Sequence, residues 1–210
     1  MKKVYVVGDA KHYADFMTGV KLVNNIEDAN IVLFTGGEDV DPSFYGCKKH
    51  MTTYSNIERD NYEKAIFDKI KPNQLALGIC RGSQFLAVMN GGKLIQNVEG
   101  HAIFGTHIIR NKENVGYEIT STHHQMQYPF DLDDKDYDIL YWSDRRSDIY
   151  QGDGIDEEYM YDNIEPEIVH YHKEGKPQCL AIQGHPEYMR KEAPVVQMLN
   201  RLINATLKTL

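Results

Sequence analysis

The chain has 210 residues, and its 23 lysines and arginines against 31 aspartates and glutamates give a formal net charge of −8. This acidic balance argues against broad electrostatic binding to nucleic acid or to an anionic membrane, and favours a small-molecule or protein partner. The opening MKKVYVVGD has only a four-residue apolar run, too short for a signal peptide, and no later stretch has membrane-spanning length. We therefore expect a soluble, cytoplasmic protein with a single domain over residues 1–210.

Short apolar runs alternate with helical patterns along the chain. Strands are predicted over 4–7, 31–34, 75–79 and 179–182, and their continuous hydrophobicity is typical of strands that are covered on both faces of a parallel sheet. Helices are predicted at helical spacing of apolar residues over 58–70, 83–90 and 193–210. The alternation predicts an α/β fold, doubly wound around a mostly parallel sheet with helices on both faces.

The stretch 131–167 differs from its surroundings because it is acidic, rich in tyrosine and interrupted by Gly152, Gly154 and Pro166. We interpret it as a surface insertion or lid on the single domain rather than as a second domain. Its charges fit a solvated face, and its tyrosines could either pack a loop or line a pocket.

The three cysteines have to be judged one by one. Cys47, Cys80 and Cys179 are widely spaced and include no CxxC pair, which argues against a disulfide framework and a zinc knuckle. Cys179 begins an apolar run and fits a small core residue, whereas Cys47 fits a loop thiol. Cys80 has more informative neighbours.

Cys80 stands at the end of an apolar run in LGICRGSQ, between Gly78 and Gly82. The order of strand, cysteine and helix is that of a nucleophile elbow. The thiol would lie at a helix N-terminus, where the helix dipole and free backbone N–H groups favour the thiolate. Side chains at the two glycine positions would collide in so tight a turn. Taken alone, the pattern fits a buried structural cysteine equally well.

Two other predicted strands end in loops with suitable partners for a thiolate. The first is TGGEDVDP at 35–42, where the N–H group of Gly37, with that of Arg81, can bind the oxyanion of a tetrahedral intermediate. The second is IQGHPEY at 182–188, where His185 can act as general base and Glu187 can orient its imidazole. Each loop alone is more often an ordinary turn, but three of them at strand ends predict an active site.

Five motifs follow in the order found in class I glutamine amidotransferase-like proteins: TGGEDVDPSFYG, RDNYE, GICRGSQ, STHHQ and IQGHPE. Together they resemble the γ-glutamyl hydrolase branch, which is Peptidase C26-like and includes γ-glutamyl-γ-aminobutyrate hydrolases. The resemblance implies a flavodoxin-like sheet, a Cys80–His185–Glu187 triad and a γ-glutamyl thioester formed on Cys80.

The same resemblance implies roles for residues outside the triad. It assigns substrate binding to four of them: Gln84, His123, His124 and Gln125. It also gives Arg59 and Asp60, in RDNYE, a mainly structural role in bracing the helix of the nucleophile or the oxyanion loop.

The sequence departs from the pattern of the family in three places. The run from Gly8 to Asn30 is short, so an early βα unit is expected to be trimmed or missing. Gly184 replaces the usual aromatic residue before His185, which would leave room beside the triad. The acidic stretch 144–166 takes the place of a compact turn. The resemblance therefore does not identify the pocket for the leaving group, nor the substrate.

Nine histidines raise the possibility of a metal site. His170 and His172 would share one face of a strand, but no HExxH or similar catalytic metal motif is present. His101 and His107 are expected to be hydrogen-bonded structural residues. We therefore expect neither a metal nor a cofactor.

The favoured function is a stand-alone hydrolase that cleaves a γ-glutamyl amide in a small molecule. A glutaminase subunit that uses glutamine and delivers ammonia to a separate synthase would need the same three residues. A non-catalytic or redox-sensing relative would use the cysteine alone, and intact His185 and Glu187 argue against it. The oligomeric state is left open by the sequence.

Overall fold

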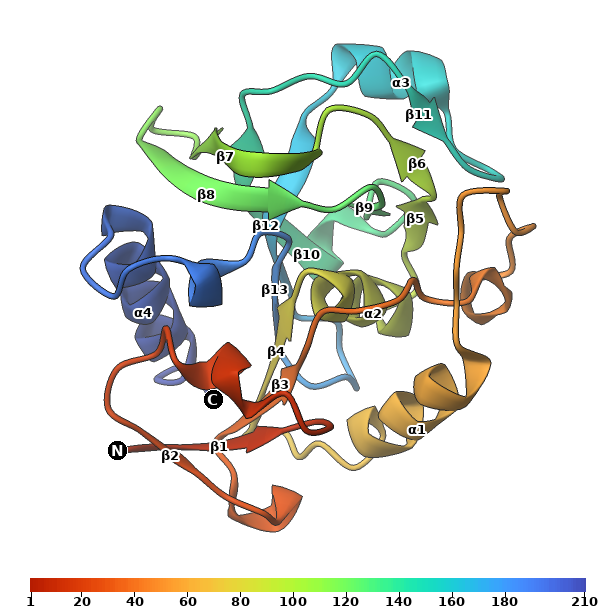
Figure 1. The fold of residues 1–210 in the computed structure, drawn as a ribbon. Coiled ribbons are helices and arrows are strands. Elements are labelled where there is room, and N and C mark those ends of the chain that lie inside the picture. The colour runs from red at the N-terminus through yellow and green to blue at the C-terminus, as the bar shows by residue number, and fades with distance from the viewer.

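A mixed sheet of nine strands forms the centre of the structure (Figure 1). The structure is a computed structural model that describes residues 1–210, apart from the side chain of Phe104. Across the sheet the strands are β2 (Val20–Leu22), β1 (Lys2–Val6), β3 (Ile31–Phe34), β4 (Leu75–Ile79), β13 (Cys179–Ile182), β12 (Glu165–Tyr171), β10 (Tyr137–Ser143), β7 (Ala102–Arg110) and β8 (Gly116–Thr122). Two small antiparallel pairs lie outside it: β5 (Lys93–Ile95) with β9 (Met126–Tyr128), and β6 (Asn97–Val98) with β11 (Tyr150–Gln151).

Helices cover both faces of the sheet, with α4 on one side and α1 and α2 on the other (Figure 1). The predicted helices are confirmed, with slightly different ends. The α-helices are α1 (Ile57–Phe67), α2 (Arg81–Met89), α3 (Glu157–Asp162) and α4 (Pro194–Thr206), and short 3₁₀ turns lie at Lys11–Ala14, Ile26–Asp28, Pro42–Tyr45, Asp134–Asp136 and Pro186–Tyr188. Within the part of the chain that the structure describes, every helix is too short or too polar to cross a membrane.

Three of the four predicted apolar strands, β3, β4 and β13, are buried on both faces as their sequences predict, whereas β1 is only partly covered. On one face Leu77 of β4 shares an apolar core with Leu199 of α4. On the other face Ala76 shares a second core with Phe85 of α2. Cys179 belongs to this second core, where burial raises the pKa of its thiol to about 12, so it is a core residue as expected.

The two halves of the sheet pair in opposite ways. Strands β2, β1, β3, β4 and β13 are parallel, whereas β12, β10, β7 and β8 are antiparallel to their neighbours. The predicted α/β fold is confirmed, but its sheet is mixed rather than mostly parallel. Among the residues that the structure describes, turns such as 111–115 and the segment 144–164, with the short helix α3, connect the antiparallel strands. The polar, alternating sequence of a strand such as β8 does not predict a buried strand.

The stretch 131–167 does not lie wholly outside the sheet. Its residues 137–143 form β10, which pairs with both β12 and β7. Residues 144–164 form the part outside the sheet, including β11 and α3, and they pack on a small apolar core around Tyr150 and Met160. The segment that fits the expected insertion is therefore narrower than the sequence suggested.

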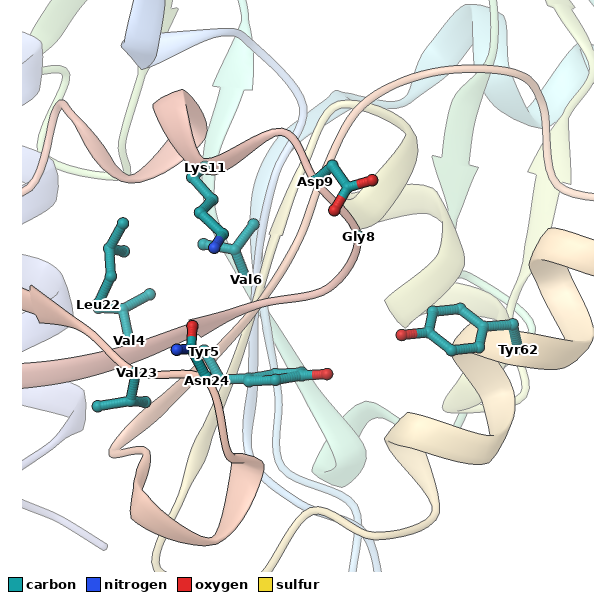
Figure 2. A pocket seen from close by; sticks show the side chains of 10 residues that line it. All are labelled: Val4, Tyr5, Val6, Gly8, Asp9, Lys11, Leu22, Val23, Asn24 and Tyr62. Atoms are coloured by element: carbon teal, nitrogen blue, oxygen red, sulfur yellow. The ribbon is translucent and has the colours of Figure 1, made fainter.

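The connection from β1 to β3 contains only short 3₁₀ turns and the edge strand β2, so the expected trimming of an early βα unit is observed. Without a helix over this part of the sheet, a hollow of about 220 Å³ remains beside β1 and β2. In Figure 2 the hydroxyl groups of Tyr5 and Tyr62 face each other across this hollow. Tyr62 is on the apolar side of the predicted helix but is half exposed for this reason.

The elbow at Cys80 is possible because β4 and α2 approach each other closely. A Cβ atom at Gly78 would lie 2.4 Å from the carbonyl oxygen of Gly82, and a Cβ atom at Gly82 would lie 2.2 Å from the carbonyl oxygen of Phe34. Both obstacles are backbone atoms, which cannot move aside as a flexible side chain can. The predicted need for glycine at both positions is therefore confirmed.

A buried cluster of charges connects α1 to the start of α2. The guanidinium of Arg81 is 2% exposed and forms ion pairs with Asp60 and Glu63, while its Nε atom donates a hydrogen bond to the carbonyl of Glu38 at 3.1 Å. Asp60 also accepts a 2.8 Å hydrogen bond from the N–H of Asp41. Burying these charges is costly unless each is paired, so the cluster fixes the relative positions of three segments.

We predict that Gly82→Ala destabilises the protein by about 1–3 kcal/mol, although alanine favours a helix over glycine by roughly 1 kcal/mol, because the new methyl group collides with the backbone of β3. Chemical denaturation measures the free energy of unfolding. Gly105→Ala is the matched control, because a Cβ atom there meets nothing within 4 Å. A stability of Gly82→Ala equal to or above that of the wild type would contradict the packing described here.

We also predict that Asp60→Asn lowers the free energy of unfolding by about 3–5 kcal/mol, since it leaves the buried Arg81 guanidinium with incomplete charge compensation. Asp68→Asn removes an exposed partner of Lys64 and should change stability by less than about 0.5 kcal/mol. Equal effects of the two substitutions in denaturant titrations would show that the buried ion pair does not stabilise the fold.

Candidate active site

Three loops meet at one edge of the sheet because β3, β4 and β13 are adjacent and parallel. The loop 35–41 follows β3, Cys80 follows β4, and His185 follows β13. The carboxyl ends of parallel strands lie at the same edge, so residues far apart in the sequence come together there.

Cys80 has a strained backbone, with φ of 52° and ψ of −112°. A positive φ is uncommon for a residue with a side chain, and it is maintained here by bonds on both sides of the residue. The N–H of Cys80 donates to the carbonyl of Ile182 at 2.8 Å, and its own carbonyl accepts hydrogen bonds from the N–H and the hydroxyl of Ser83 at 2.9 and 2.6 Å. The thiol is therefore held at the first turn of α2, where the helix dipole stabilises a thiolate.

His185 is fixed from several directions. Its Nδ1 atom lies 2.6 Å from Oε1 of Glu187, and both side chains are buried. Its backbone N–H and carbonyl both bind the hydroxyl of Thr120 on β8. The ring of Tyr188 stacks on the imidazole with a centroid distance of 4.9 Å. These contacts leave Nε2 as the ring nitrogen that can interact with the thiol of Cys80.

The electrostatics favour a charged imidazole. Burial lowers the pKa of His185, but its interactions with Cys80 and Glu187 outweigh burial and raise this pKa to about 10. An imidazolium at neutral pH is the form that stabilises a neighbouring thiolate and can donate a proton to a leaving group.

The loop after β3 offers backbone donors beside the thiol. Gly37 has φ of +138°, and a Cβ atom there would lie 2.1 Å from the guanidinium of Arg59. Arg59 in turn donates to the carbonyl of Gly36 at 2.9 Å and pairs with Glu38 at 2.8 Å. Within the described part of the chain, the N–H groups of Gly37 and Arg81 have no hydrogen-bond acceptor, so both are free to bind an oxyanion.

The motif at 59–63 braces this loop, as the sequence suggested. Arg59 holds the loop directly, whereas Asp60 acts through Arg81. The guanidinium of Arg81 is occupied by its ion pairs. The backbone N–H of Arg81 is therefore the group that can contact a ligand in the cavity. Glu63, which the sequence analysis did not single out, bridges Arg59 at 2.9 Å and also contacts Arg81. Its spacing of four residues from Arg59 on a helix was the available signal.

A cavity of about 180 Å³ opens beside Cys80. Its lining includes all four residues expected to bind substrate, together with Gly37, Glu38, Asp39, Tyr54, Cys80, Arg81 and Thr122. None of the described residues that line it comes from 131–167, the stretch interpreted as a possible lid. The volume is below the roughly 300–1,000 Å³ of sites for drug-sized ligands, so the cavity suits a small group.

The four residues expected to bind substrate differ in their contacts. The side chain of His124 is 36% exposed and its Nε2 atom lies 3.1 Å from Asp39, a hydrogen bond that raises its pKa. Gln84 donates to the carbonyl of Gln125 at 2.9 Å, and Gln125 donates to Thr53 at 3.1 Å. His123 is buried and its Nδ1 atom binds the same carbonyl. His124 is thus the most accessible of the four.

Tyr13 is a further residue that sequence reasoning missed. Burial raises the pKa of its hydroxyl, as do the neighbouring charges of Glu187 and Cys80, and its ring lies 6.2 Å from that of His185. Tyr13 lies in the 3₁₀ turn Lys11–Ala14, in the short connection that lacks a crossover helix. The local sequence has no motif that predicts a contact with His185.

The expectation of free space at Gly184 is wrong. A Cβ atom there would lie 2.6 Å from Cγ1 of Ile119 and 2.7 Å from the carbonyl oxygen of Thr120. Strand β8 fills the position, so the glycine permits a close approach of β8 to His185 rather than leaving a gap.

Solved structures with similar folds were found at low sequence identity. A glutamine amidotransferase from Thermotoga maritima is 14% identical, with a TM-score of 0.57 over 89% of this chain and 76% of that chain. The glutaminase domain of Trypanosoma brucei CTPS, with bound acivicin, is 9% identical, with a TM-score of 0.54 over 98% of this chain and 94% of that one. Both agree with an α/β fold of the class I glutamine amidotransferase type.

Curated relatives match over shorter stretches. A glutamine amidotransferase-like protein of Rickettsia prowazekii is 41% identical over 70 residues, which is 32% of this chain and 25% of the relative. Protein NtpR of Enterococcus hirae is 32% identical over 75 residues, which is 35% of this chain and 31% of the relative. The matched part of the chain thus spans less than a third of the length of these relatives.

A family model covers more of the chain than these pairwise matches. The model of Peptidase C26 matches residues 17–130, which is more than half of the 210 residues and includes the loop after β3, Cys80 and the segment 121–125. The order of motifs, the fold and this match agree, and the chain belongs to the Peptidase C26 family of class I glutamine amidotransferase-like proteins.

Proposed function

We propose that the protein is a cysteine-dependent hydrolase that cleaves a γ-glutamyl amide through a γ-glutamyl thioester on Cys80. The observation that carries the proposal is the convergence of a strained cysteine, a buried His185–Glu187 pair and free backbone N–H groups at one edge of the sheet. A triad of this kind needs a nucleophile, a base and a group that orients the base.

In the first half of the proposed reaction, the Cys80 thiolate attacks the δ-carbonyl carbon of the substrate. The carbonyl oxygen becomes an oxyanion, which the N–H groups of Gly37 and Arg81 stabilise. The His185 imidazolium donates its proton to the amide nitrogen, the C–N bond breaks, and the amine leaves. The acyl group remains bound to sulfur as a thioester.

In the second half, neutral His185 removes a proton from water as the water oxygen attacks the thioester carbonyl. The C–S bond breaks, glutamate is released, and the Cys80 thiolate and the His185 imidazolium are restored. Glu187 keeps Nδ1 of the ring occupied throughout, which directs Nε2 towards the reacting atoms.

The cavity supports a small substrate group with both charges of an amino acid. At its edge, the Asp39–His124 pair combines a carboxylate with an imidazole whose pKa is raised by that contact. Such a pair can accept a hydrogen bond from an α-ammonium group and donate one to an α-carboxylate. We infer that the glutamyl end of the substrate lies in this cavity.

A glutaminase subunit is the second candidate, because one of the similar structures is described as a GMP synthase subunit from Thermoplasma acidophilum. That structure is 16% identical with a TM-score of 0.62, a likeness of fold. In this alternative the chemistry on Cys80 is unchanged, glutamine is the substrate, and the released ammonia passes to a separate synthase.

We predict that glutamine, γ-glutamyl-p-nitroanilide or γ-glutamyl-γ-aminobutyrate forms a γ-glutamyl adduct on Cys80. Intact-protein mass spectrometry after an acid quench within the first turnover detects it. Cys80→Ala should abolish both the adduct and turnover, whereas Cys47→Ala, which alters a half-buried thiol outside the lining of the cavity, should retain both.

The outcome separates the two candidates. Turnover by the protein alone supports the hydrolase, and turnover that rises only with a synthase partner supports the glutaminase subunit. If no substrate reacts while Cys80 can still be alkylated, the proposed hydrolase activity is wrong.

We predict an activity that persists well above the ordinary histidine pKa of about 6.5 and declines as pH rises through about 10, where His185 loses its proton. Glu187→Gln removes a carboxylate that raises this pKa, so its alkaline limit should move to lower pH and kcat/KM should fall by about 10²-fold or more. The pH profile of kcat/KM measures both effects. Superimposable profiles for wild type and Glu187→Gln would exclude the proposed role of Glu187.

A further inference from the structure

A second group of buried side chains lies at the antiparallel half of the sheet, next to the cavity, which one of its members, His123, also lines. It consists of His101, His107, His123 and Glu167, which we call the buried histidine cluster. Each side chain in it is at most 4% exposed. None of these four side chains carries a step of the proposed reaction. His101 directly precedes β7, His107 is on β7, Glu167 is on β12, and His123 follows β8.

Three imidazole nitrogens surround one carboxylate oxygen. From Oε1 of Glu167, Nε2 of His107 lies at 3.0 Å, Nδ1 of His101 at 3.5 Å and Nε2 of His123 at 3.6 Å. Within the described residues, none of these four atoms makes a hydrogen bond of ordinary geometry. They point towards a common region instead of pairing with each other, and orphaned buried polar atoms are costly.

The tautomer of His123 is fixed by its other ring nitrogen. Nδ1 lies 2.8 Å from the carbonyl of Gln125, which can only accept a hydrogen bond, so Nδ1 carries a proton. In the neutral ring, Nε2 then presents a lone pair to the carboxylate of Glu167. Two acceptors that face each other in a buried site require a positive charge between them, which is either a proton on Nε2 or a metal ion.

His101 repeats this arrangement. Its Nε2 atom lies 3.1 Å from Oε2 of Glu165 and its Nδ1 atom lies 3.5 Å from Oε1 of Glu167. Against the effect of burial, the two carboxylates raise the pKa of His101 to about 9, and a metal ion would displace the proton from Nδ1 and bind the lone pair there. Glu165 is itself held by the N–H of Ser147 at 2.7 Å and the hydroxyl of Tyr150 at 2.5 Å. A histidine whose second nitrogen donates to a carboxylate or a carbonyl is the usual support for a metal ligand.

We propose that the buried histidine cluster binds one Zn²⁺ ion through Nδ1 of His101, Nε2 of His123 and Oε1 of Glu167, three residues whose ligand atoms lie within 4.8 Å of one another. Ligands about 2.0–2.1 Å from a tetrahedral Zn²⁺ stand roughly 3.4 Å apart, close to the observed separations from Oε1 of Glu167. Two imidazoles and a carboxylate suit Zn²⁺ better than Mg²⁺ or Ca²⁺, which prefer oxygen. The two charges of the ion balance those of Glu165 and Glu167.

Three protein ligands leave a fourth position, which a shift of His107, with its Nε2 atom 3.0 Å from Oε1 of Glu167, or a water molecule would complete. The site adjoins the cavity through the carbonyl of Gln125, which accepts hydrogen bonds from both His123 and Gln84 of α2. The ion would therefore fix the segment 123–125 against the helix that carries Cys80. This proposal replaces the expectation that His101 and His107 are only hydrogen-bonded structural residues.

The test is the zinc content of the untagged full-length chain after dialysis without chelator, measured by inductively coupled plasma mass spectrometry. Because a thiolate beside an imidazole can itself bind Zn²⁺, the measurement is repeated in Cys80→Ala. We expect about one equivalent in both proteins. Replacement by Co²⁺ should give the visible absorption bands of a tetrahedral ion, and Mg²⁺ should not compete.

Variants locate the ion. Glu167→Gln should weaken Zn²⁺ binding by more than about 100-fold, and Glu165→Gln, which removes an outer partner, by about 10–100-fold. The matched control is the double variant His170→Asn/His172→Asn, which destroys an exposed trio with Asp138 that could also hold a metal. The control should keep its zinc.

A measurement on the wild type remains decisive if a cluster variant fails to fold. Chelator-stripped protein whose circular dichroism shows it folded should gain about 5–10 °C in Tm at Zn²⁺ concentrations 100-fold above Kd. Folded protein with less than about a tenth of an equivalent and no rise in Tm would overturn the proposal in favour of a protonated or hydrated cluster. Zinc that is lost in the His170/His172 double variant, or kept in Glu167→Gln, would also overturn it.

Discussion

The buried guanidinium of Arg81 is the contact on which the geometry of the site depends. It is located one residue after Cys80, and its ion pairs with Asp60 and Glu63 join the first turn of α2 to α1. Its third hydrogen bond, to the carbonyl of Glu38, joins both helices to the loop after β3. The N–H of Arg81 and the N–H of Gly37 are thereby held at fixed positions beside the sulfur. A planar group with five donors can make these connections at once, and lysine cannot.

Two structural devices place the candidate reactive groups. The first is the close backbone packing at Gly78 and Gly82, beside which Cys80 adopts a positive φ. The second is the hydroxyl of Thr120, which binds the backbone of His185 and so fixes the position of its imidazole. The first device belongs to the parallel half of the sheet, and the second crosses to β8 in the antiparallel half. The mixed sheet therefore contributes to the site from both halves.

The sequence allowed the local part of this arrangement to be predicted. The G-x-C-x-G motif spans five residues and predicts a glycine at both positions, although the contact that requires Gly82 is with the carbonyl of Phe34 in β3. The spacing of His185 and Glu187 is local as well, since it spans two residues. Four strands and three helices were also predictable from continuous or periodic hydrophobicity. Strand β10 and the contact of Ile119 with Gly184 were not, because they depend on which distant segments pair. The same holds for Tyr13, which reaches His185 from a short turn that has no sequence signature.

The short link between β1 and β3 has a mechanical consequence. Strand β2 has only three residues, pairs on one side alone, and has no α-helix from its own connections over it. Few buried contacts and an edge position are the marks of a segment that opens locally at low free-energy cost. Amide exchange in β2 would thus be fast while β4 and β13, enclosed between neighbours and helices, exchange only through global opening. Two strands, β1 and β3, lie between β2 and β4, the strand that leads to Cys80. Strand β2 can therefore open locally without disturbing the elbow.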